Sequence, residues 1–502
     1  MVRRILWTAV IVVLLVIGLV AGVRRQYLRE YFTGLTHEIA ILFGAPREVE
    51  RPPPSVKVGE TTLVSTGLMN FDMTDVKGSG PTGDLGGGLG LAPGGLLVVH
   101  DRDGSVQFYD WTGGTVSILR FQLPPLDLDA LPKTGPDGKD FDNEFMRYLD
   151  IELFPQPGGV HVAVSYLHYD RGHACFAPRL AEAKLPDDWR LPLPDGATPR
   201  QLDWRILSEI KPCISATSNI VHSHQNGGRI VVETSSTLLI TTGDFSNDGR
   251  FGSPHVTQLD DSGWGRVLRV NLNSAQVDEV ARGLRNPQGL AYDSDGNLWA
   301  TDHGAMGGDE LDLIREGGNY GWPEVTLGTD YVVPRNDKRY WPLNSRQGRH
   351  DSYDPPAYAW MPSIAPSSIK LVTGLNERWD GDLLVATLVD ETLHRLRMDG
   401  TRVVYDEPIR IGRRIRDLEI ASETIYLLFD DGSLAKLVPH EIPPADGDQS
   451  VDLLGQSGCF ECHSRSGAPQ LDRALGPGSL HSRALRTAQP SRPKGENGPA
   501  KR

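Results

Sequence analysis

The stretch GLRNPQGLAYDSDGNLWATDHGAMGGDELDLIREGGNYGWP, residues 283–323, decides the fold class of this chain. Its centre, from Leu290 to Asp302, contains two short β-type runs joined by an Asp-Gly turn. An Asp-Gly pair between alternating strands is a strong hairpin signal, because Gly adopts positive φ without steric cost. Loops rich in Gly, Pro and polar groups flank this hairpin, and β-scaffolds keep their chemistry in such loops. The stretch therefore predicts a β-hairpin with functional loops at its ends.

The same hairpin pattern recurs along the chain, at residues 96–111, 393–407 and 425–438. Long amphipathic helical periods do not interrupt it, so these hairpins predict an all-β domain over residues 63–440. A β-propeller is favoured because radial closure protects the edges of its sheets. An array of two-sheet sandwiches is the alternative, and the irregular spacing of the hairpins leaves the number of blades open.

The charge of the chain narrows the class of partner. The 502 residues carry a formal net charge of −14, with a pI near 5.5. Nucleic-acid binding requires a basic face, so the sequence predicts no nucleic-acid partner. Small neutral substrates are compatible with this charge. The 55 Gly and 36 Pro favour a turn-rich β protein over a helical one.

The N-terminal region predicts attachment to a membrane. Ile5 to Val23 is an apolar run with arginines on both sides, long enough to span a bilayer of about 30 Å. We expect a transmembrane helix within residues 1–25, followed by a juxtamembrane segment and Pro-rich linker over 26–62. A cleaved signal peptide is the alternative. Both interpretations place the body outside the cytoplasm, and we expect an inner-membrane-anchored protein facing the periplasm.

Two of the four cysteines predict a disulfide bond. Cys175 and Cys213 form an even pair outside any metal-binding or haem string. In an oxidising compartment such a pair is more often bonded than free. Their pairing therefore agrees with a location outside the cytoplasm.

The other two cysteines belong to a C-x-x-C-H string in residues 441–488, which we interpret as a cytochrome c-like segment. Cys459 and Cys462 would hold a c-type haem covalently, with His463 as the proximal iron ligand. No Met follows this string, so His481 is the predicted sixth ligand. A decayed remnant or a zinc or redox pair is the alternative. The basic, Pro- and Gly-rich tail at 489–502 predicts disorder.

Several polar motifs occur in a characteristic order: SHQNGGR (223–229), TGD (242–244), RNPQG (285–289) and NYGWP (319–323). From roughly Gly86 to Pro439, this order resembles the soluble, pyrroloquinoline quinone (PQQ)-dependent aldose and glucose dehydrogenases of the glucose/sorbosone dehydrogenase family. The resemblance implies a six-bladed β-propeller.

The resemblance also implies four catalytic residues, His224, Asp244, Arg285 and Asn286. Oxidation of a sugar at C1 removes a proton from the hydroxyl and a hydride from carbon. His224 would accept the proton, because a neutral imidazole titrates near the working pH. Asp244 would fix the orientation of the imidazole, and Arg285 would stabilise developing negative charge. A histidine taken alone is more often structural, so this assignment depends on the ordered set.

Binding of PQQ requires fixed cations, because the cofactor carries three carboxylates. Arg414 and Arg416 stand two apart in a strand-like segment and would share one face. They match the arginine pair of the family, and Gln288 and His303 match positions at the edge of the cofactor. Val389 is a departure, because glucose dehydrogenases commonly have a cofactor-binding Lys there. The first-blade Glu-Gly-Gly-Leu-Leu-Gly motif of the family is also only approximated.

The acidic, glycine-containing loop at 302–310 predicts calcium, which binds six to eight oxygens from carboxylates and carbonyls. The resemblance implies a structural ion at Glu310 and the carbonyl of Tyr320. It implies a second ion, next to the quinone, at the carbonyls of Gly304 and Ala305. A solvated acidic turn is the alternative.

Together these patterns predict a membrane-anchored, periplasmic quinoprotein dehydrogenase. It would oxidise an aldose or similar sugar or alcohol by hydride transfer to PQQ and pass electrons to the haem and a membrane electron-transfer chain. A propeller without cofactor, acting as a binding or scaffold module, is one alternative. A calcium-dependent propeller hydrolase is another.

Overall fold

The computed structural model describes residues 55–440 with gaps, of which the longest are 77–86, 135–145, 216–224 and 329–349. Several predicted features lie outside the described residues and stay predictions. They are the N-terminal anchor, the Pro-rich linker up to Pro54, His224, the haem segment with Cys459, Cys462, His463 and His481, and the tail at 489–502. None of the helices in the described part of the chain has the length and apolar character needed to cross a bilayer.

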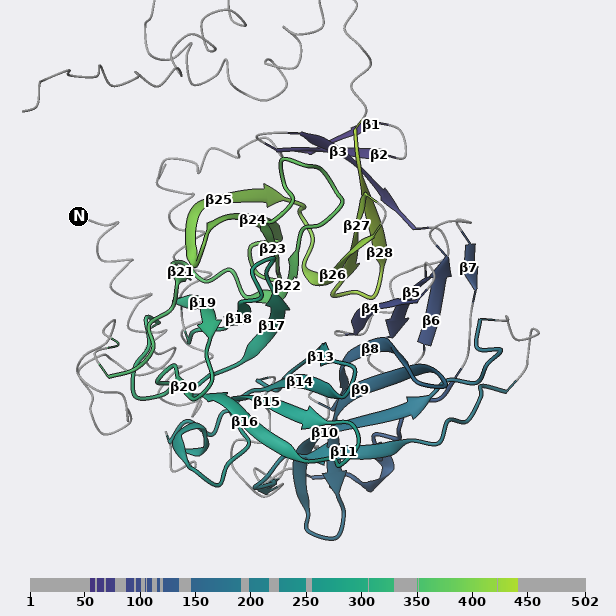
Figure 1. Ribbon diagram of the computed structural model, residues 1–502, viewed down its shortest axis with the longest axis vertical. Helices are drawn as coiled ribbons and strands as arrows, with labels where there is room; N and C mark the ends of the chain where they lie inside the picture. The colour runs from purple at the N-terminus through teal and green to yellow at the C-terminus, as the bar shows by residue number, and fades with distance from the viewer. Residues whose placement is uncertain are drawn as a thin grey trace, which may run out of the picture.

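The described residues form six sheets, antiparallel except for one short strand, arranged around a common centre (Figure 1). Blade 1 contains β4 (Gly88–Ala92), β5 (Leu96–His100), β6 (Val106–Asp110) and β7 (Thr115–Ser117). Blade 2 contains β8 (Tyr148–Gln156), β9 (Gly159–Asp170), β10 (Cys175–Lys184) and β11 (Arg205–Glu209), with β12 (Ile214–Ser215) paired to β10. Blade 3 contains β13 (Gly227–Thr234), β14 (Thr237–Thr242), β15 (Arg266–Asn271) and β16 (Val277–Arg282), and β20 (Gly318–Asn319) joins it in parallel.

The remaining blades complete the circle. Blade 4 contains β17 (Pro287–Tyr292), β18 (Leu298–Asp302), β19 (Asp309–Ile314) and β21 (Tyr358–Trp360). Blade 5 contains β22 (Pro366–Leu371), β23 (Leu383–Thr387), β24 (Thr392–Asp399) and β25 (Arg402–Arg410). Blade 6 contains β26 (Ile415–Ala421), β27 (Thr424–Phe429), β28 (Leu434–Pro439), β3 (Asn70–Asp75), β2 (Thr61–Ser65) and β1 (Ser55–Val58). Two short 3-10 turns, η1 (Leu128–Ala130) and η3 (Val256–Gln258), lie in loops.

Closure of the ring confirms the predicted propeller and fixes six blades. The innermost strands contact one another in the order β4, β8, β13, β17, β22, β26, and β26 returns to β4. In blade 6, β28 pairs antiparallel with β3, so an N-terminal strand completes the sheet formed by the end of the domain. Pairing of the first and last strands of the propeller in one blade leaves no open gap in the ring.

The hairpin predicted at Leu290–Asp302 is β17–β18, and its turn shows how the local sequence specifies it. Gly296 has φ +82°, which a residue with a Cβ rarely adopts. The carboxylate of Asp293 accepts the backbone N–H of Asn297 at 2.8 Å and the indole N–H of Trp299 at 2.8 Å. Asp293 therefore anchors the turn to the buried first part of β18.

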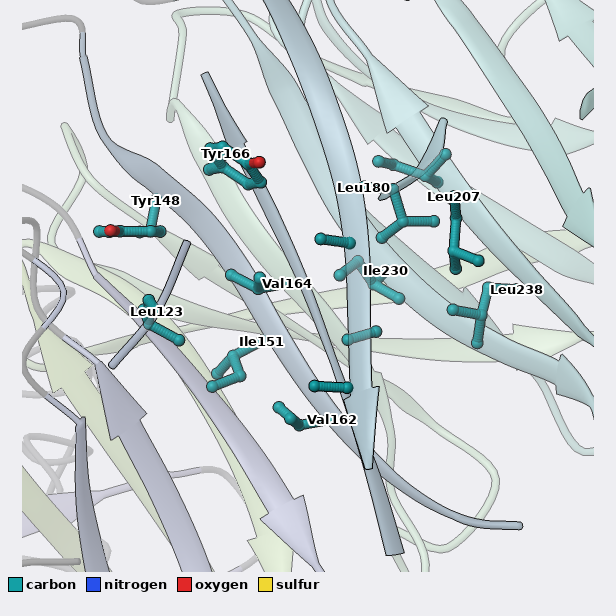
Figure 2. Close-up of a cluster of buried hydrophobic side chains, with 14 of the residues drawn as sticks. Leu123, Tyr148, Ile151, Val162, Val164, Tyr166, Leu180, Leu207, Ile230 and Leu238 are labelled. Atoms are coloured by element: carbon teal, nitrogen blue, oxygen red, sulfur yellow. The ribbon is translucent and has the colours of Figure 1, made fainter. Parts of the chain in front are cut away.

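The core lies between neighbouring blades. The largest cluster packs blades 1, 2 and 3 together, and Figure 2 shows part of it. The side chains labelled there are Leu123, Tyr148, Ile151, Val162, Val164, Tyr166, Leu180, Leu207, Ile230 and Leu238. The predicted disulfide is confirmed: Cys175 in β10 is bonded to Cys213, with Cα atoms 5.6 Å apart.

Candidate active site

A cavity of about 270 Å³ lies at the centre of the ring. Its wall is built at or just before the start of all six innermost strands and just after the second strands of blades 4, 5 and 6, so every blade contributes to it. The lining residues are Gly87, Arg147, Tyr148, Leu149, Gly227, Arg229, Gln288, His303, Ser367, Leu388, Arg414, Arg416 and Asp430. All four non-haem residues predicted to bind a cofactor are among them. The structure therefore brings these four residues together, although Gln288 and Arg416 are 128 positions apart in the sequence.

Two arginines of β26 and the segment before it are held by one carboxylate. Arg414 Nε donates to Asp430 Oδ2 at 2.9 Å, and Arg416 Nε donates to Asp430 Oδ1 at 3.0 Å. Burial opposes ionisation of Asp430, but the two guanidinium groups prevail and lower its pKa. One negative charge between two positive ones leaves this side of the cavity cationic, which suits an anionic ligand.

Gln288 and His303 form the neighbouring part of the wall. Gln288 Oε1 lies 3.5 Å from Arg416 Nη1. His303 Nε2 lies 2.7 Å from the carbonyl oxygen of Pro366, and because a carbonyl only accepts, Nε2 carries the proton. Burial lowers the pKa of His303 to about 4, so the ring is neutral at pH 7 and its Nδ1 is an acceptor.

Asp244 and Arg285 lie close together around Trp322. The indole Nε1 of Trp322 donates to Asp244 Oδ2 at 2.8 Å, and the guanidinium of Arg285 lies 5.4 Å from the ring centre of Trp322. Asp244 is completely buried, and burial raises its pKa to about 7, with Asp248 adding to the rise and Arg285 opposing it. A carboxyl group with such a pKa can change protonation state near neutral pH.

Asn286 and Asp302 hold the loop that carries Arg285. Asp302 accepts the backbone N–H of Arg285 at 2.7 Å and that of Asn286 at 2.5 Å. Asn286 Oδ1 accepts the backbone N–H of Gly227 at 3.2 Å, which connects the loop to the start of β13. Asn286 thus positions the loop between blades 3 and 4, and a catalytic role for its amide stays a prediction.

The predicted calcium loop divides into two parts. Asp309 accepts the backbone N–H of Gly304 at 2.9 Å and those of Ile364 and Ala365 at 2.8 Å, so its carboxylate is occupied within the protein. Arg285 Nη1 donates to the carbonyl of Gly304 at 2.6 Å. Gly304 and its buried neighbour Ala305 therefore lie next to the predicted catalytic arginine, and a cation there would share the carbonyl of Gly304 with Arg285.

Glu310 and Asp312 lie on one face of β19, and Asp309 lies on the other. Burial, followed by the neighbouring carboxylates, raises the pKa of Glu310 and that of Asp312 well above their usual range. Tyr320 packs along β19 and donates its hydroxyl proton to the carbonyl of Leu313 at 2.5 Å. Among the described residues no group of three His, Cys, Asp or Glu side chains converges as a metal site, so an ion here needs backbone oxygens as well.

A buried ion cluster around Arg229, in the wall of the cavity, is a feature that the sequence did not predict. Arg229 Nη1 donates to Asp150 at 3.0 Å and to Asp417 at 2.8 Å. Its other nitrogens donate to the carbonyls of Gln288 and Ser367, each at 3.0 Å. Asp417 also accepts the backbone N–H of Leu89 at 3.0 Å. These bonds connect all six innermost strands, because the residues concerned lie on β4, β8, β13, β17, β22 and β26.

Sequence reasoning missed further residues of the site. Asp430 stands in the Asp-Asp-Gly turn of a predicted hairpin, and a turn position alone accounts for an Asp there without any role in binding. Trp322 was recognised only as part of a turn motif. Arg147 precedes β8 and lines the cavity, and nothing in its local sequence indicated this position. A charged residue at an inward position of an otherwise apolar strand, as Arg229 is in β13, was the one available signal.

The comparisons with known proteins agree with this geometry. Residues 200–438 match the family model described as Glucose / Sorbosone dehydrogenase. The match includes blades 3 to 5 and, in blade 6, β26, β27 and nearly all of β28, and therefore Asp244, the 285–288 loop and the arginine pair.

Curated relatives and a solved structure extend the match. The chain is 32% identical over 259 residues to an uncharacterized protein of Synechocystis. The aligned region covers 47% of this chain and 60% of the relative. It is 28% identical over 233 residues to the aldose sugar dehydrogenase YliI of Escherichia coli, covering 42% of this chain and 60% of that protein. The chain thus spans about three fifths of these relatives. The crystal structure of soluble aldose sugar dehydrogenase from Escherichia coli in the apo-form shares the fold, with TM-score 0.57, 21% identity, and coverage of 74% of this chain and 100% of that one.

Proposed function

We propose that this protein is a PQQ-dependent dehydrogenase that oxidises an aldose or a similar sugar. The observation that carries the proposal is the convergence of Gln288, His303, Arg414 and Arg416 on one central cavity. The relatives support it: one is an aldose sugar dehydrogenase, and another, 28% identical over 287 residues, is the quinoprotein glucose dehydrogenase B of Acinetobacter calcoaceticus.

The residues of the cavity fit a flat, anionic cofactor. Four arginines line it, and the pair at 414 and 416 retains a positive excess over Asp430. The volume of about 270 Å³ is near the lower end, about 300 Å³, of small-ligand pockets. Arg414 and Arg416 would bind carboxylates, while Gln288 and His303 Nδ1 would contact polar groups at the cofactor edge. When bound, PQQ supplies the acceptor for the two electrons removed from the sugar.

Residues beside the cavity can handle the proton. His224 would accept the proton of the sugar hydroxyl, and Gly227, three positions later in the sequence, lines the cavity. Each oxygen of Asp244 already accepts one hydrogen bond within the chain and retains capacity for another donor, such as an imidazole N–H. Arg285 has a buried Nε without a partner among the described residues, which leaves a donor for a ligand oxygen. Calcium at the carbonyls of Gly304 and Ala305 would add positive charge at the same place.

The test is reconstitution of the full chain with PQQ and calcium, followed by reduction of a redox dye with a panel of aldoses. The proposal predicts dye reduction that requires both PQQ and sugar. His224→Ala should lower kcat by about two to four orders of magnitude, because a general base is removed. Arg402→Gln, an exposed change on the outer strand β25, is the control that keeps full activity. Binding of PQQ with no oxidation of any aldose would contradict the proposed activity.

One observation favours a propeller without cofactor as a second candidate. Val389, at the position where the family commonly has Lys, is 62% exposed and does not line the cavity, although its neighbour Leu388 does. A binding or scaffold module predicts that the protein retains no PQQ under the same conditions. The reconstitution experiment therefore separates the two candidates.

We propose further that the propeller is anchored to the inner membrane, faces the periplasm and passes electrons to a C-terminal c-type haem and a membrane chain. The disulfide between Cys175 and Cys213 supports an oxidising compartment. The haem assignment depends on the C-x-x-C-H string at 459–463. Expression with a cytochrome c maturation system should give a denaturation-resistant haem stain that Cys462→Ser abolishes. Absence of the stain in the unmodified protein would contradict the haem assignment.

A further inference from the structure

The interface between blades 3 and 4 contains carboxylates in an apolar setting, away from the cofactor cavity. Asp302 of β18 pairs with Glu310 of β19, and Ala300 pairs with Asp312. Alternate residues of a strand face the same side, so Glu310, Asp312 and Ile314 share one face of the sheet. Ile314 and Ala300 belong to the hydrophobic cluster that packs blade 4 against blade 3 and also includes Tyr320. Asp312 therefore stands between apolar neighbours.

The hydrogen bonding of these carboxylates differs. Both oxygens of Asp302 accept backbone N–H groups, and Glu310 accepts the N–H of Leu327. Asp312 has zero exposed surface, and neither of its oxygens has a hydrogen-bond partner among the described residues. The charged groups that act on it, Asp302 and Asp354, are also acidic. Its charge is thus uncompensated by the described chain.

A buried carboxylate of this kind needs a counter-charge. Placing an ionised carboxylate in an apolar environment is so unfavourable that buried charges are paired or coordinate metals. Two carboxylates on one strand face, Glu310 and Asp312, carry the charge that neutralises one divalent cation. Oxygen ligands alone suit calcium, which accepts bidentate carboxylates and backbone carbonyls.

We propose that Asp312 is a ligand of a calcium ion buried between blades 3 and 4, with Glu310 and the carbonyl of Tyr320. The resemblance to known dehydrogenases suggested Glu310 and Tyr320, whereas the role of Asp312 comes from its uncompensated burial. Tyr320 follows β20 of blade 3, and the carboxylates belong to β19 of blade 4. The ion therefore ties two blades together. Glu310 also stands opposite Asp302, the group that holds the backbone of the Arg285–Asn286 loop.

Thermal unfolding of the full chain tests this proposal without any PQQ, so its outcome is independent of the proposed dehydrogenase activity. The variants are Asp312→Asn, which removes the charge at nearly constant shape, and Asp295→Asn, an exposed control in the β17–β18 turn of the same blade. Added calcium should raise the melting temperature of the wild type and of the control, because an ion bound by the native state stabilises it.

The effect of Asp312→Asn should change sign with calcium. In chelator the variant should melt at or above the wild type, because the cost of burying this carboxylate, or of protonating it against its ordinary pKa, is gone. In calcium it should melt below the wild type, and its calcium affinity should be at least tenfold weaker. If Asp312 had only a packing role, Asp312→Asn would lower the melting temperature equally in both conditions. That result would overturn the proposal.

A second measurement keeps the proposal testable if Asp312→Asn does not fold. Terbium replaces calcium at oxygen sites and luminesces when a nearby Tyr or Trp is excited. Terbium should bind the wild type at a site sensitised by aromatic excitation, calcium should displace it, and Glu310→Gln should lose that signal. Absence of the signal in the wild type, or its persistence in Glu310→Gln, would contradict the site.

Discussion

On the propeller axis, Arg229 lies between the carboxylates of Asp150 and Asp417, whereas between blades 3 and 4 the carboxylate of Asp312 has no partner among the described residues. Both regions are almost completely excluded from solvent. The first compensates its charges with groups of the chain and adds backbone bonds to two further strands. The second has no counter-charge among the described residues, and we propose that a bound cation supplies it.

The difference separates two ways of joining blades. The axial cluster connects all six innermost strands through bonds that form as soon as the ring closes. Its contribution requires no ion from the solution. The proposed ion at Asp312 would join only two blades, and its contribution would depend on the concentration of the cation by mass action. Closure of the propeller thus needs only groups of the chain. The position of the Arg285–Asn286 loop, in contrast, would depend on the proposed cation.

The largest expected change in folding stability follows from substitution of Arg229 on the propeller axis. Arg229→Met leaves Asp150 and Asp417 buried without their cation, which should lower the free energy of unfolding by about 3–5 kcal/mol. Denaturant unfolding measures it, and the exposed change Arg402→Met is the control. A loss below about 1 kcal/mol, the range of a surface ion pair, would show that the axial cluster does not hold the ring.

A smaller change is expected at Asp430, whose carboxylate is shared by the guanidinium groups of Arg414 and Arg416. Arg416→Gln removes one guanidinium, but Arg414 still compensates Asp430, so the free energy of unfolding should change little. The dissociation constant for PQQ should rise by about 10–100-fold, because hydrogen bonds to charged groups contribute about 1.5–3 kcal/mol. Equilibrium binding measures this, with Arg402→Gln as the control. Loss of stability together with unchanged PQQ affinity would assign this arginine to the fold alone.

An effect that shows only as a dependence of stability on pH concerns Asp244, whose buried carboxyl has a pKa raised to about 7 from the ordinary 3.8. The folded state holds this proton more tightly than the unfolded state, so its stabilising contribution is full below pH 4 and is lost as the pH rises through 7. Asp244→Asn, which cannot ionise, should remove that component, up to about 1.4 kcal/mol per pH unit. Unfolding curves of both proteins between pH 4 and 8 measure it. Equal pH slopes would mean that Asp244 has an ordinary pKa.

Local sequence patterns predicted most of the scaffold. The Asp-Gly hairpins became β17–β18, β24–β25 and β27–β28, because turn geometry and strand alternation act over a few residues. The spacing of Arg414 and Arg416 likewise predicted their common face. The disulfide was found because only one pair of cysteines remained outside the haem string.

The groups that depend on register between distant strands were not predictable from the sequence. Arg229 bonds to Asp417, 188 positions away, only because β13 and β26 start at the same end of the axis. Asp430 reaches both arginines because β27 returns beside β26. The uncompensated state of Asp312 likewise emerges only when its neighbours across the sheet are known. Assignments at His224 and at the haem string remain predictions.

The most direct test of the central claim, that the axial cavity is a cofactor site, is calorimetric titration of PQQ into the full, calcium-loaded chain. The arrangement of Gln288, His303, Arg414 and Arg416 predicts binding of one PQQ per chain, weakened by salt because the contacts are ionic. Absence of binding at any calcium concentration would contradict the assignment and leave the protein as a propeller that binds something else.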